Sequence, residues 1–304
     1  MIRILFILAF LLSLDASSNE FYGRIAVDTR STNLSEESET DVESNESKVG
    51  FKGSFKLNED NGDLSLIYQA EYGFDPVDGK ARGDEGTFKQ RNTFLGIKSK
   101  NYGTLMAGTH DTAFKKAQFK IDLFNDLLPD IKNILQGENR FEDYVGYISP
   151  KFKNYFFTIN SIKNPNPGTS NYKSYSVHYT GDKFSASVAI DDAVKGYDSS
   201  RYSLLVPLGS LQFGFIFQDS KKISTNASDK GKVISVQKKL SDKNKIKFQY
   251  ADSDMKVVGG KNTTLGLDHL LAKDLTLFIF YSDFKADNDA KEREVFSVGL
   301  EYKF

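Results

Sequence analysis

The chain has 304 residues, with 40 Lys and Arg against 41 Asp and Glu, so its formal net charge is −1. Balanced charge provides no basic surface of the kind that binds nucleic acid, and we expect no nucleic-acid partner. The absence of cysteine excludes a disulfide framework and thiolate chemistry, whereas 25 Phe and 15 Tyr suit strands with one aromatic and one polar face.

The chain begins with the pattern of a secretory signal peptide. Arg3 supplies a positive charge, Ile4–Leu14 is a short apolar run, and Ala16–Ser18 provides small residues for cleavage. A membrane-spanning helix needs roughly 20 apolar residues, and this run is shorter. The sequence therefore predicts a signal peptide over residues 1–18 and a mature domain over residues 19–304.

The mature domain is a series of segments in which apolar and polar residues alternate. In the first segment Phe21 and Ile25 share one face, and Arg24, Asp28 and Arg30 share the other. The last segment alternates in the same way, with one face made of Phe296, Val298, Leu300, Tyr302 and Phe304. Successive side chains of a β-strand point to opposite faces, so about sixteen such segments predict an all-β fold.

The connections between these segments alternate in length. Short turns are expected at Asn58–Asp63, Ser99–Gly103, Gly181–Lys183, Pro207–Ser210 and Ser241–Asn244. Longer polar stretches are expected at Ser31–Glu46, Asp75–Thr87, Asn164–Asn171, Ser220–Asp229 and Phe284–Glu292. Short turns at one edge and long loops at the other indicate an antiparallel transmembrane β-barrel, which closes because open edges would leave unpaired backbone groups in lipid. A soluble sandwich or propeller is the alternative, but no propeller repeat of about 40–50 residues occurs.

One connection, from about residue 111 to residue 143, is much longer than the others. It mixes acids with bases, and Phe124, Leu127, Leu128 and Ile131 recur at helical spacing, which predicts a short helix. A loop of this length inside a compact domain is usually functional.

Five motifs occur in the order in which they occur in one known family. They are Glu20–Asp28; Phe94–Ile97 with Tyr102–Leu105 and Ala107–Gly108; Arg140 with Tyr144–Phe152; Leu265–Lys273; and Val298–Phe304. On these motifs the chain resembles the general porins of Gram-negative bacteria, especially the neisserial and related proteobacterial trimeric porins. Two residues depart from the family pattern: His110 stands where arginine is common, and His269 stands where tyrosine is common.

The resemblance implies a 16-stranded barrel, usually a homotrimer, whose long third loop folds into the lumen. It implies that Phe304 belongs to the signal read by the outer-membrane barrel assembly machinery, and that the protein lies in the outer membrane among lipid and lipopolysaccharide. The function expected is passive diffusion of small hydrophilic solutes and ions. The alternative is a substrate-selective channel with a defined ligand, such as phosphate or a dicarboxylate, at the inner loop.

Charged side chains that face each other across a constriction create a transverse field that sorts solutes by charge. The loop acids are candidates for one side, and bases on the lumen-facing side of the strands are candidates for the other. The full set of constriction candidates is Arg24, Asp28, Arg30, His110, Asp122, Asp126, Asp130, Arg140 and Arg201.

Catalytic chemistry has no clear signal in the sequence. No nucleophile and base form a recognisable pair, and the three histidines, His110, His178 and His269, lack metal-ligand spacing. We therefore expect no enzyme activity, no catalytic residue, no metal and no cofactor. A barrel enzyme is the remaining alternative, but such barrels typically use fewer strands.

Overall fold

The structure is a computed structural model that describes residues 18–34, 38–57, 63–79, 86–166, 168–288 and 291–304. The predicted signal peptide, apart from Ser18, lies outside the described residues. The strands of the first half are β1 (Ser18–Asn33), β2 (Ser38–Ser44), β3 (Lys48–Lys56), β4 (Leu64–Gly73), β5 (Lys89–Gln90), β6 (Thr93–Ser99), β7 (Gly103–Asp111), β8 (Arg140–Ile148) and β9 (Tyr155–Ile162). Those of the second half are β10 (Tyr172–Thr180), β11 (Ser185–Val194), β12 (Tyr197–Leu208), β13 (Leu211–Lys222), β14 (Ser228–Lys239), β15 (Asn244–Ser253), β16 (Lys261–Ala272), β17 (Leu275–Lys285) and β18 (Arg293–Lys303).

Eighteen strand segments form one closed antiparallel sheet. The sheet closes because β1 pairs with β18 on one side and with β2 and β3 on the other. β2 and β3 are two halves of one interrupted strand along β1, and β5 and β6 are two halves of another along β4. The barrel therefore has the sixteen antiparallel strands that the sequence predicts.

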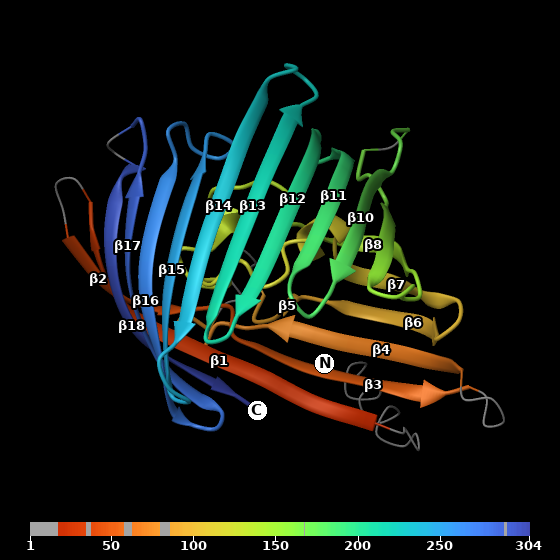
Figure 1. The fold of residues 1–304 in the computed structure, drawn as a ribbon, viewed down its shortest axis with the longest axis horizontal. Helices are drawn as coiled ribbons and strands as arrows, with labels where there is room; N and C mark the ends of the chain where they lie inside the picture. Colours follow the sequence, from red (N-terminus) through yellow and green to blue (C-terminus); the bar gives the residue numbers. More distant parts are fainter. Residues whose placement is uncertain (1–17, 35–37, 58–62, 80–85, 167, 289–290) are drawn as a thin grey trace.

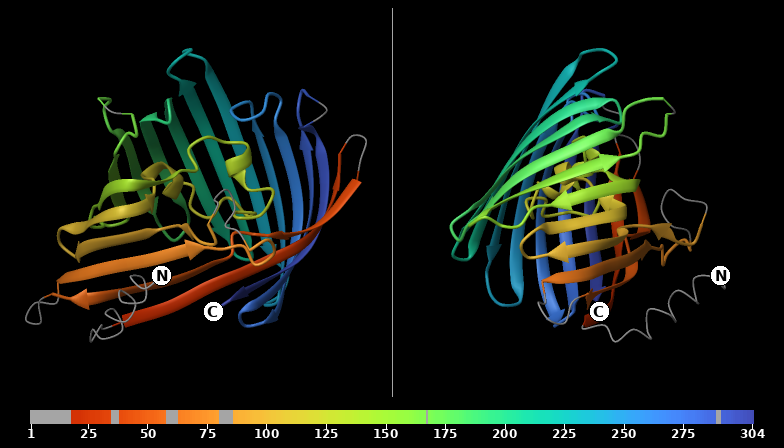
Figure 2. Two further views of the ribbon diagram at one scale, coloured as in Figure 1. Left: turned by 180° about the vertical axis from the view of Figure 1, so that it is seen from behind. Right: turned by 90° about the vertical axis from the view of Figure 1, so that its right-hand side faces the viewer.

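The strands differ in length and slant around the barrel. β12, β13 and β14 have 12 residues each, whereas β8 has 9 and β9 has 8. Figures 1 and 2 show β12–β14 rising steeply, while β3, β4 and β6 lie across the molecule. The wall is therefore high on one side of the barrel and low on the other.

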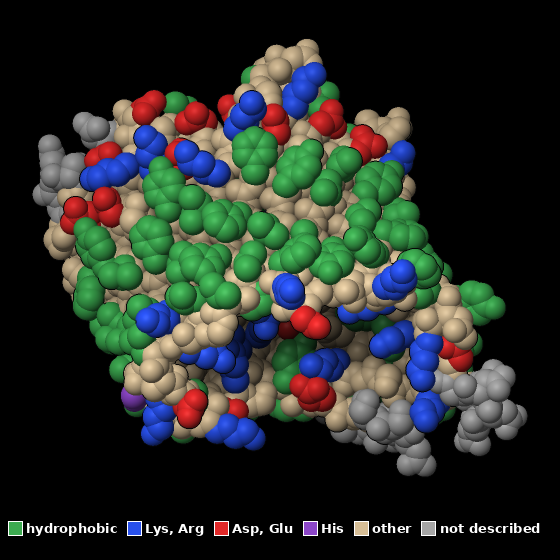
Figure 3. All heavy atoms as spheres, viewed as in Figure 1, with side chains coloured by type: hydrophobic (Ala, Val, Ile, Leu, Met, Phe, Trp, Pro, Cys, Tyr) green, Lys and Arg blue, Asp and Glu red, His purple; other side chains and the backbone are tan. Residues whose placement is uncertain are grey.

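Side chains along each strand alternate between the outside of the barrel and its interior. On β18 the outward Phe296 and Leu300 are 51% and 47% exposed, whereas the intervening Ser297 is fully buried. Figure 3 shows the outward apolar side chains as a continuous belt across the middle of one face, with charged side chains above and below it. A barrel with an apolar outer band and a polar interior is the arrangement that outer-membrane proteins use.

One predicted connection differs from the structure, and one further connection is shorter than the predicted alternation in length implies. The described residues of the stretch Ser31–Glu46 are mostly strand, because β1 continues to Asn33 and pairs with β2 over Val27–Asn33, so the strands satisfy each other's backbone groups. At the same end of the barrel, β11 and β12 are joined by only Lys195 and Gly196, both with positive φ. The alternation of short and long connections is thus a tendency rather than a strict rule.

The long connection between β7 and β8 contains only short helical turns. They are α2 (Ala113–Lys116) and the 3-10 turn η1 (Ile131–Asn133). The helix predicted from the spacing of Phe124 to Ile131 is wrong, because Asp126 has a φ of +68° and Pro129 follows it. The apolar spacing instead places these side chains on the barrel wall. Among the described residues, no helix has the length and apolar character needed to cross a membrane.

The connection lies inside the barrel, against the inner faces of strands from β9 to β18. The N–H of Ala113 donates to Oδ1 of Asn160 on β9 at 2.5 Å, and Oγ of Ser187 on β11 donates to the carbonyl of Ala117 at 2.6 Å. Further along, the N–H of Leu123 donates to Oε1 of Gln249 on β15 at 2.8 Å. The left view of Figure 2 shows this yellow-green segment crossing the interior in front of β12–β14.

Candidate functional site

Two connected polar chambers lie between the loop of residues 112–139 and the barrel wall. The larger has a volume of about 680 Å³ and reaches Gln212 and Lys245 beside short turns, so we call it the inner chamber. The smaller has a volume of about 250 Å³ and reaches Gly73–Asp75 beside a long connection, so we call it the outer chamber. The residues that line both chambers form what we call the throat: Arg91, Lys115, Asn125, Asp126 and Arg140.

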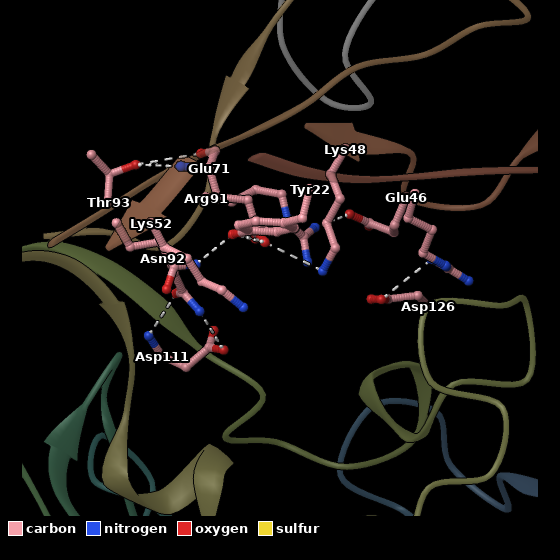
Figure 4. Close-up of polar contacts among 12 residues, drawn as sticks. Tyr22, Glu46, Lys48, Lys52, Glu71, Arg91, Asn92, Thr93, Asp111 and Asp126 are labelled. Atoms are coloured by element: carbon pink, nitrogen blue, oxygen red, sulfur yellow. Dashed lines mark hydrogen bonds and ion pairs between the residues drawn. The ribbon is translucent and has the colours of Figure 1, made fainter. Parts of the chain in front are cut away.

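The wall side of the throat is a charged network centred on Arg91, which lies in the break between β5 and β6. Its Nε donates to Glu71 at 2.9 Å and its NH1 donates to Glu46 at 2.5 Å. Glu71 also accepts from the hydroxyl of Tyr22 at 3.0 Å and pairs with Nζ of Lys48 at 3.4 Å. Figure 4 shows this network on the wall, with Asp126 facing it from the loop. Bonds between ionised partners are stronger than neutral ones, so the network holds the Arg91 guanidinium in place.

The loop side of the throat is the tip formed by Asn125 and Asp126. The N–H of Asp126 donates to Oδ2 of Asp130 at 2.9 Å, which supports its left-handed backbone. The Asp126 carboxylate lies 3.5 Å from the guanidinium of Arg24, whose Nε bonds Glu301 at 2.5 Å. A loop acid therefore faces bases on the wall, which is the arrangement that produces a transverse field.

The third part of the throat is formed where the loop leaves β7 and enters β8. Nζ of Lys115 and Nε of Arg140 each lie 3.1 Å from the same carboxylate oxygen of Asp111. Nε of Arg140 also donates to Oδ1 of Asn92 at 2.9 Å. Because one carboxylate serves two bases, this part of the throat keeps a net positive charge.

Two loop acids hold the loop backbone rather than facing the throat. Asp122 accepts hydrogen bonds from the N–H groups of Phe124 and Ile131 at 3.0 and 3.1 Å, and from Nε2 of Gln249 at 3.1 Å. Asp130 accepts from the N–H of Lys132 at 2.7 Å. Burial and the neighbouring Asp130 raise the pKa of Asp122 well above its usual range.

The loop is also held by apolar contacts with the inner wall. Ile121, Ile131 and Leu135 of the loop pack into a buried cluster with Ile216 on β13 and Val233 on β14. A second cluster joins Phe124 and Leu127 to Phe278, Phe280 and Val295 on β17 and β18. The interior of this barrel therefore contains a dry apolar seat beside its polar passage.

Three wall glycines make room for this seat. A Cβ at Gly266 would lie 2.7 Å from the ring of Phe124, and one at Gly214 would lie 2.8 Å from Ile121. A Cβ at Gly231 would overlap Leu135. Any larger side chain at these positions would push the loop away from the wall.

The structure brings together some of the predicted constriction residues and separates others. Asp126 and Arg140 lie in the throat, and Asp122 and Asp130 line the inner and outer chambers respectively. Arg24 contacts the throat through Asp126.

The other four candidates lie away from the throat. Asp28 and Arg30 form a buried pair at 2.8 Å on β1. Arg201 is fully buried behind the loop, where it bonds Glu138 at 2.6 Å. The ring of His110 packs against those of Phe94 and Tyr144, with centroids 5.3 and 5.2 Å away. Each of these side chains supports the wall or the loop.

Arg91, Lys115 and Asn125 belong to the throat but were not singled out from the sequence. Lys115 is visible as one base among several in the long loop, but Arg91 precedes a strand and belongs to no alternating segment. Their position depends on where the loop folds back, which the alternation of single strands does not encode.

No metal-binding arrangement of three His, Cys, Asp or Glu side chains occurs among the described residues. The chambers are polar passages with charged walls, and what they can do chemically is admit water and hydrophilic solutes while sorting them by charge and size.

A family model described as Gram-negative porin matches residues 11–290 of the chain. Similar solved structures include the anion-selective porin from Comamonas acidovorans, with a TM-score of 0.77 at 17% identity over 94% of this chain and 99% of that one. They also include Salmonella typhi OmpF in complex with daunomycin, with a TM-score of 0.77 at 15% identity over 94% and 97%. The trimer form of OmpT from Vibrio cholerae has a TM-score of 0.68 at 14% identity over 95% and 100%. No curated protein matches the sequence.

Proposed function

The chain belongs to the Gram-negative porin family and is an outer-membrane channel for passive diffusion of small hydrophilic solutes, not an enzyme; we propose that the throat is its constriction. The proposal rests on one observation: the same five residues line both chambers, so any solute that passes from one to the other must pass them. Loop and wall charges face each other there, and the narrowest charged point of a channel sets its selectivity.

We propose further that this constriction favours anions. Three of the four charged residues of the throat are bases, and Asp126 is the one acid. The solved porin from Comamonas acidovorans, described as anion-selective, has the same fold. A positive throat raises the local concentration of anions and lowers that of cations.

The test is the reversal potential of the purified protein in a planar bilayer that separates two KCl concentrations. A conductance step establishes the channel, and the sign of the reversal potential reports the preferred ion. We expect the sign of an anion-selective pore. The sign of a cation-selective pore would contradict the preference while leaving the channel itself intact.

Similar porin structures include a trimer, and we propose that this chain forms a homotrimer through the low side of its wall. Over β1, β3, β4 and β6 the outward side chains are uncharged among the described residues, with Phe21, Ile25, Phe51, Leu66 and Ile97 among them. An outer-membrane barrel needs an apolar band about 25 Å tall. Strands that lie across the molecule span less of this height. A second copy of the chain therefore covers the outward apolar side chains of these strands, which lipid would otherwise contact.

A cysteine scan tests this interface, because the chain has no cysteine of its own. Ile25→Cys on β1 is expected to be shielded from a bulky thiol-reactive reagent in the trimer, and the equally exposed Ile234→Cys on the opposite, high side of the wall is the matched control that should react. Reaction of Ile25→Cys as fast as that of Ile234→Cys would place the interface elsewhere.

We propose that lipopolysaccharide and outer-membrane lipid surround the rest of the belt, and that the barrel assembly machinery reads the segment ending at Phe304. The apolar alternation of β18, with Phe304 half-exposed on the outward side, supports this assignment. Phe304→Ala is expected to reduce the amount of folded trimer recovered from the outer membrane. Equal recovery of the variant and the unaltered protein would remove Phe304 from the signal.

A further inference from the structure

Outside the throat, the two chambers have opposite charge balance. Among the described residues, those that line only the outer chamber include two bases and four acids: Lys89, Lys132, Glu46, Asp75, Asp130 and Glu138. Those that line only the inner chamber include five bases: Lys48, Lys116, Lys120, Lys245 and Lys247. Its acids are Glu71, Asp111 and Asp122. The passage therefore runs from a chamber rich in acids, through a positive throat, to a chamber rich in bases.

Ion-pair partners behind each wall reduce the charge difference between the chambers but do not reverse it. Behind the outer chamber Arg201 bonds Glu138 at 2.6 Å, and behind the inner chamber Asp268 bonds both Lys245 and Lys247 at 3.0 and 2.7 Å. Arg201 offsets one negative charge of the outer chamber, and Asp268 offsets one positive charge of the inner chamber.

Protonation of loop acids changes the charge of both chambers. Burial raises the pKa of Glu138 at the outer chamber, and burial together with Asp130 raises that of Asp122 at the inner chamber. Weaker ionisation of one acid in each chamber leaves the difference between the chambers in place.

Two lysines contribute most directly to the inner excess. Lys116 and Lys120 are exposed in the inner chamber, and within the described part of the chain neither makes an ion pair. Their charges are therefore neutralised by mobile ions in the passage and not by the protein.

A passage with opposite fixed charges at its two ends conducts differently in the two directions. At about 0.1 M salt the Debye length is about 10 Å, comparable with the size of a chamber, so each chamber is dominated by its own counter-ions. When the voltage drives anions from the inner chamber and cations from the outer chamber towards the throat, salt accumulates there. When the voltage is reversed, both are drawn away and the throat is depleted.

We propose that this channel rectifies: it passes more current when the side of the short turns is negative, and the lysines of the inner chamber set this direction. The inference rests on the proposed passage through the throat. It adds a directional property that passive diffusion through a symmetric pore does not have.

The experiment is a single-channel current–voltage curve in dilute KCl, with orientation determined for each channel. Asp242→Cys, in the short turn between β14 and β15, is labelled from one side with a thiol-reactive polyethylene glycol too large to pass the throat. We expect currents that differ by roughly twofold between about +100 and −100 mV at 0.1 M salt, and nearly equal currents at 1 M, where the Debye length is about 3 Å.

Two variants assign the effect to the chambers. Lys116→Gln combined with Lys120→Gln removes two of the five bases of the inner chamber, which leaves the two chambers with similar charge, and is expected to bring the current ratio close to 1 at low salt. Lys89→Gln removes a base from the outer chamber and makes that chamber more negative. The same kind of substitution is therefore expected to increase the current ratio at low salt.

Each outcome decides the inference. Equal currents at low salt, or a larger current with the short-turn side positive, would overturn it while leaving the channel proposal standing. An unchanged ratio in the Lys116→Gln, Lys120→Gln variant would also overturn it. A protein that forms no channels at all would contradict the proposed function instead.

Discussion

Phe304 closes the barrel on Gly23. The N–H of Gly23 donates to the carbonyl of Phe304 at 2.8 Å, and the N–H of Phe304 donates back to the carbonyl of Gly23 at 3.2 Å. The ring of Phe304 occupies the space that a Cβ on Gly23 would need. The last residue of the chain therefore depends on a glycine in the first strand, at the seam where the sheet closes.

Gly23→Val is expected to destabilise this seam by about 1–3 kcal/mol, because the added side chain displaces the terminal ring. The measurement is the temperature at which the folded barrel unfolds in detergent. Thr29→Val, on the outward side of the same strand, is the control, since Thr29 pairs with Val298 farther along the seam. Equal melting temperatures for Gly23→Val and the control would show that the ring of Phe304 can move aside without loss of stability.

Asp126→Asn is expected to increase the anion preference of the throat. Removal of the one acid among its four charged residues changes the free energy of a passing ion by about 0.5 kcal/mol, which is roughly a twofold change in the permeability ratio. The reversal potential in a salt gradient measures this ratio.

The triple variant Asp122→Asn, Asp126→Asn, Asp130→Asn is also expected to shift ion preference towards anions. Asp122 and Asp130 bond the loop backbone, so this variant should in addition loosen the loop. The single variant separates the two effects. An unchanged reversal potential in both would remove these acids from the constriction.

Gly266→Val is expected to displace the loop from its seat. A Cβ at this position lies 2.7 Å from the ring of Phe124, and the larger side chain would force the ring away from Phe280. The loop should move into the passage and narrow it, with lower conductance, more open-channel noise and slower uptake of sugars into liposomes.

A suitable comparison for Gly266→Val is Thr263→Val. Thr263 lies on the outward side of the same strand, so the substitution adds no volume inside the barrel. Normal conductance and sugar uptake in Gly266→Val would mean that the loop adapts without moving.

The stability of the loop should depend on pH through Asp122. Burial and Asp130 raise the pKa of this carboxyl, so the folded protein binds its proton more tightly than the unfolded chain does. The stabilisation is fully present below the pKa of the unfolded chain and is lost as pH rises from there through the raised pKa. Channel noise and unfolding temperature, measured across this range, should show a loop that loosens with rising pH.

Asp122→Asn removes the titrating proton and should flatten this dependence. Asp126→Asn should keep it, because Asp126 is not the group that is buried. A loop that loosens with falling pH, or an unchanged profile in Asp122→Asn, would assign the behaviour to another group.

The architecture was accessible from the sequence because it depends on a local pattern. Alternation with a period of two reports which face of a strand is apolar, and it placed Arg24 and Asp28 on the interior side and Phe296 and Leu300 on the outside, as the structure has them. The alternating segments number about sixteen, and the family resemblance implies sixteen strands.

The throat was only partly accessible, because it depends on contacts between residues far apart in the chain. Asp126 could be predicted as a charged residue of the long loop, but its neighbour Arg24 is 102 positions away and Arg91 lies in a strand break. Arg201 shares the interior parity of Arg24, yet the loop covers it completely. The alternation along a strand indicates which side chains face the interior. The path of the loop decides which of those side chains are exposed to solvent in the passage.

The glycines at positions 214, 231 and 266 have a consequence for grafting this loop into another barrel. The loop is shaped to three vacancies spread over β13, β14 and β16, so its sequence alone does not carry the geometry of the opening. A graft into another barrel would have to bring the matching vacancies with it. Without them the grafted loop could not pack against the wall. The recipient barrel would then hold an unanchored segment in its lumen and would have no defined opening.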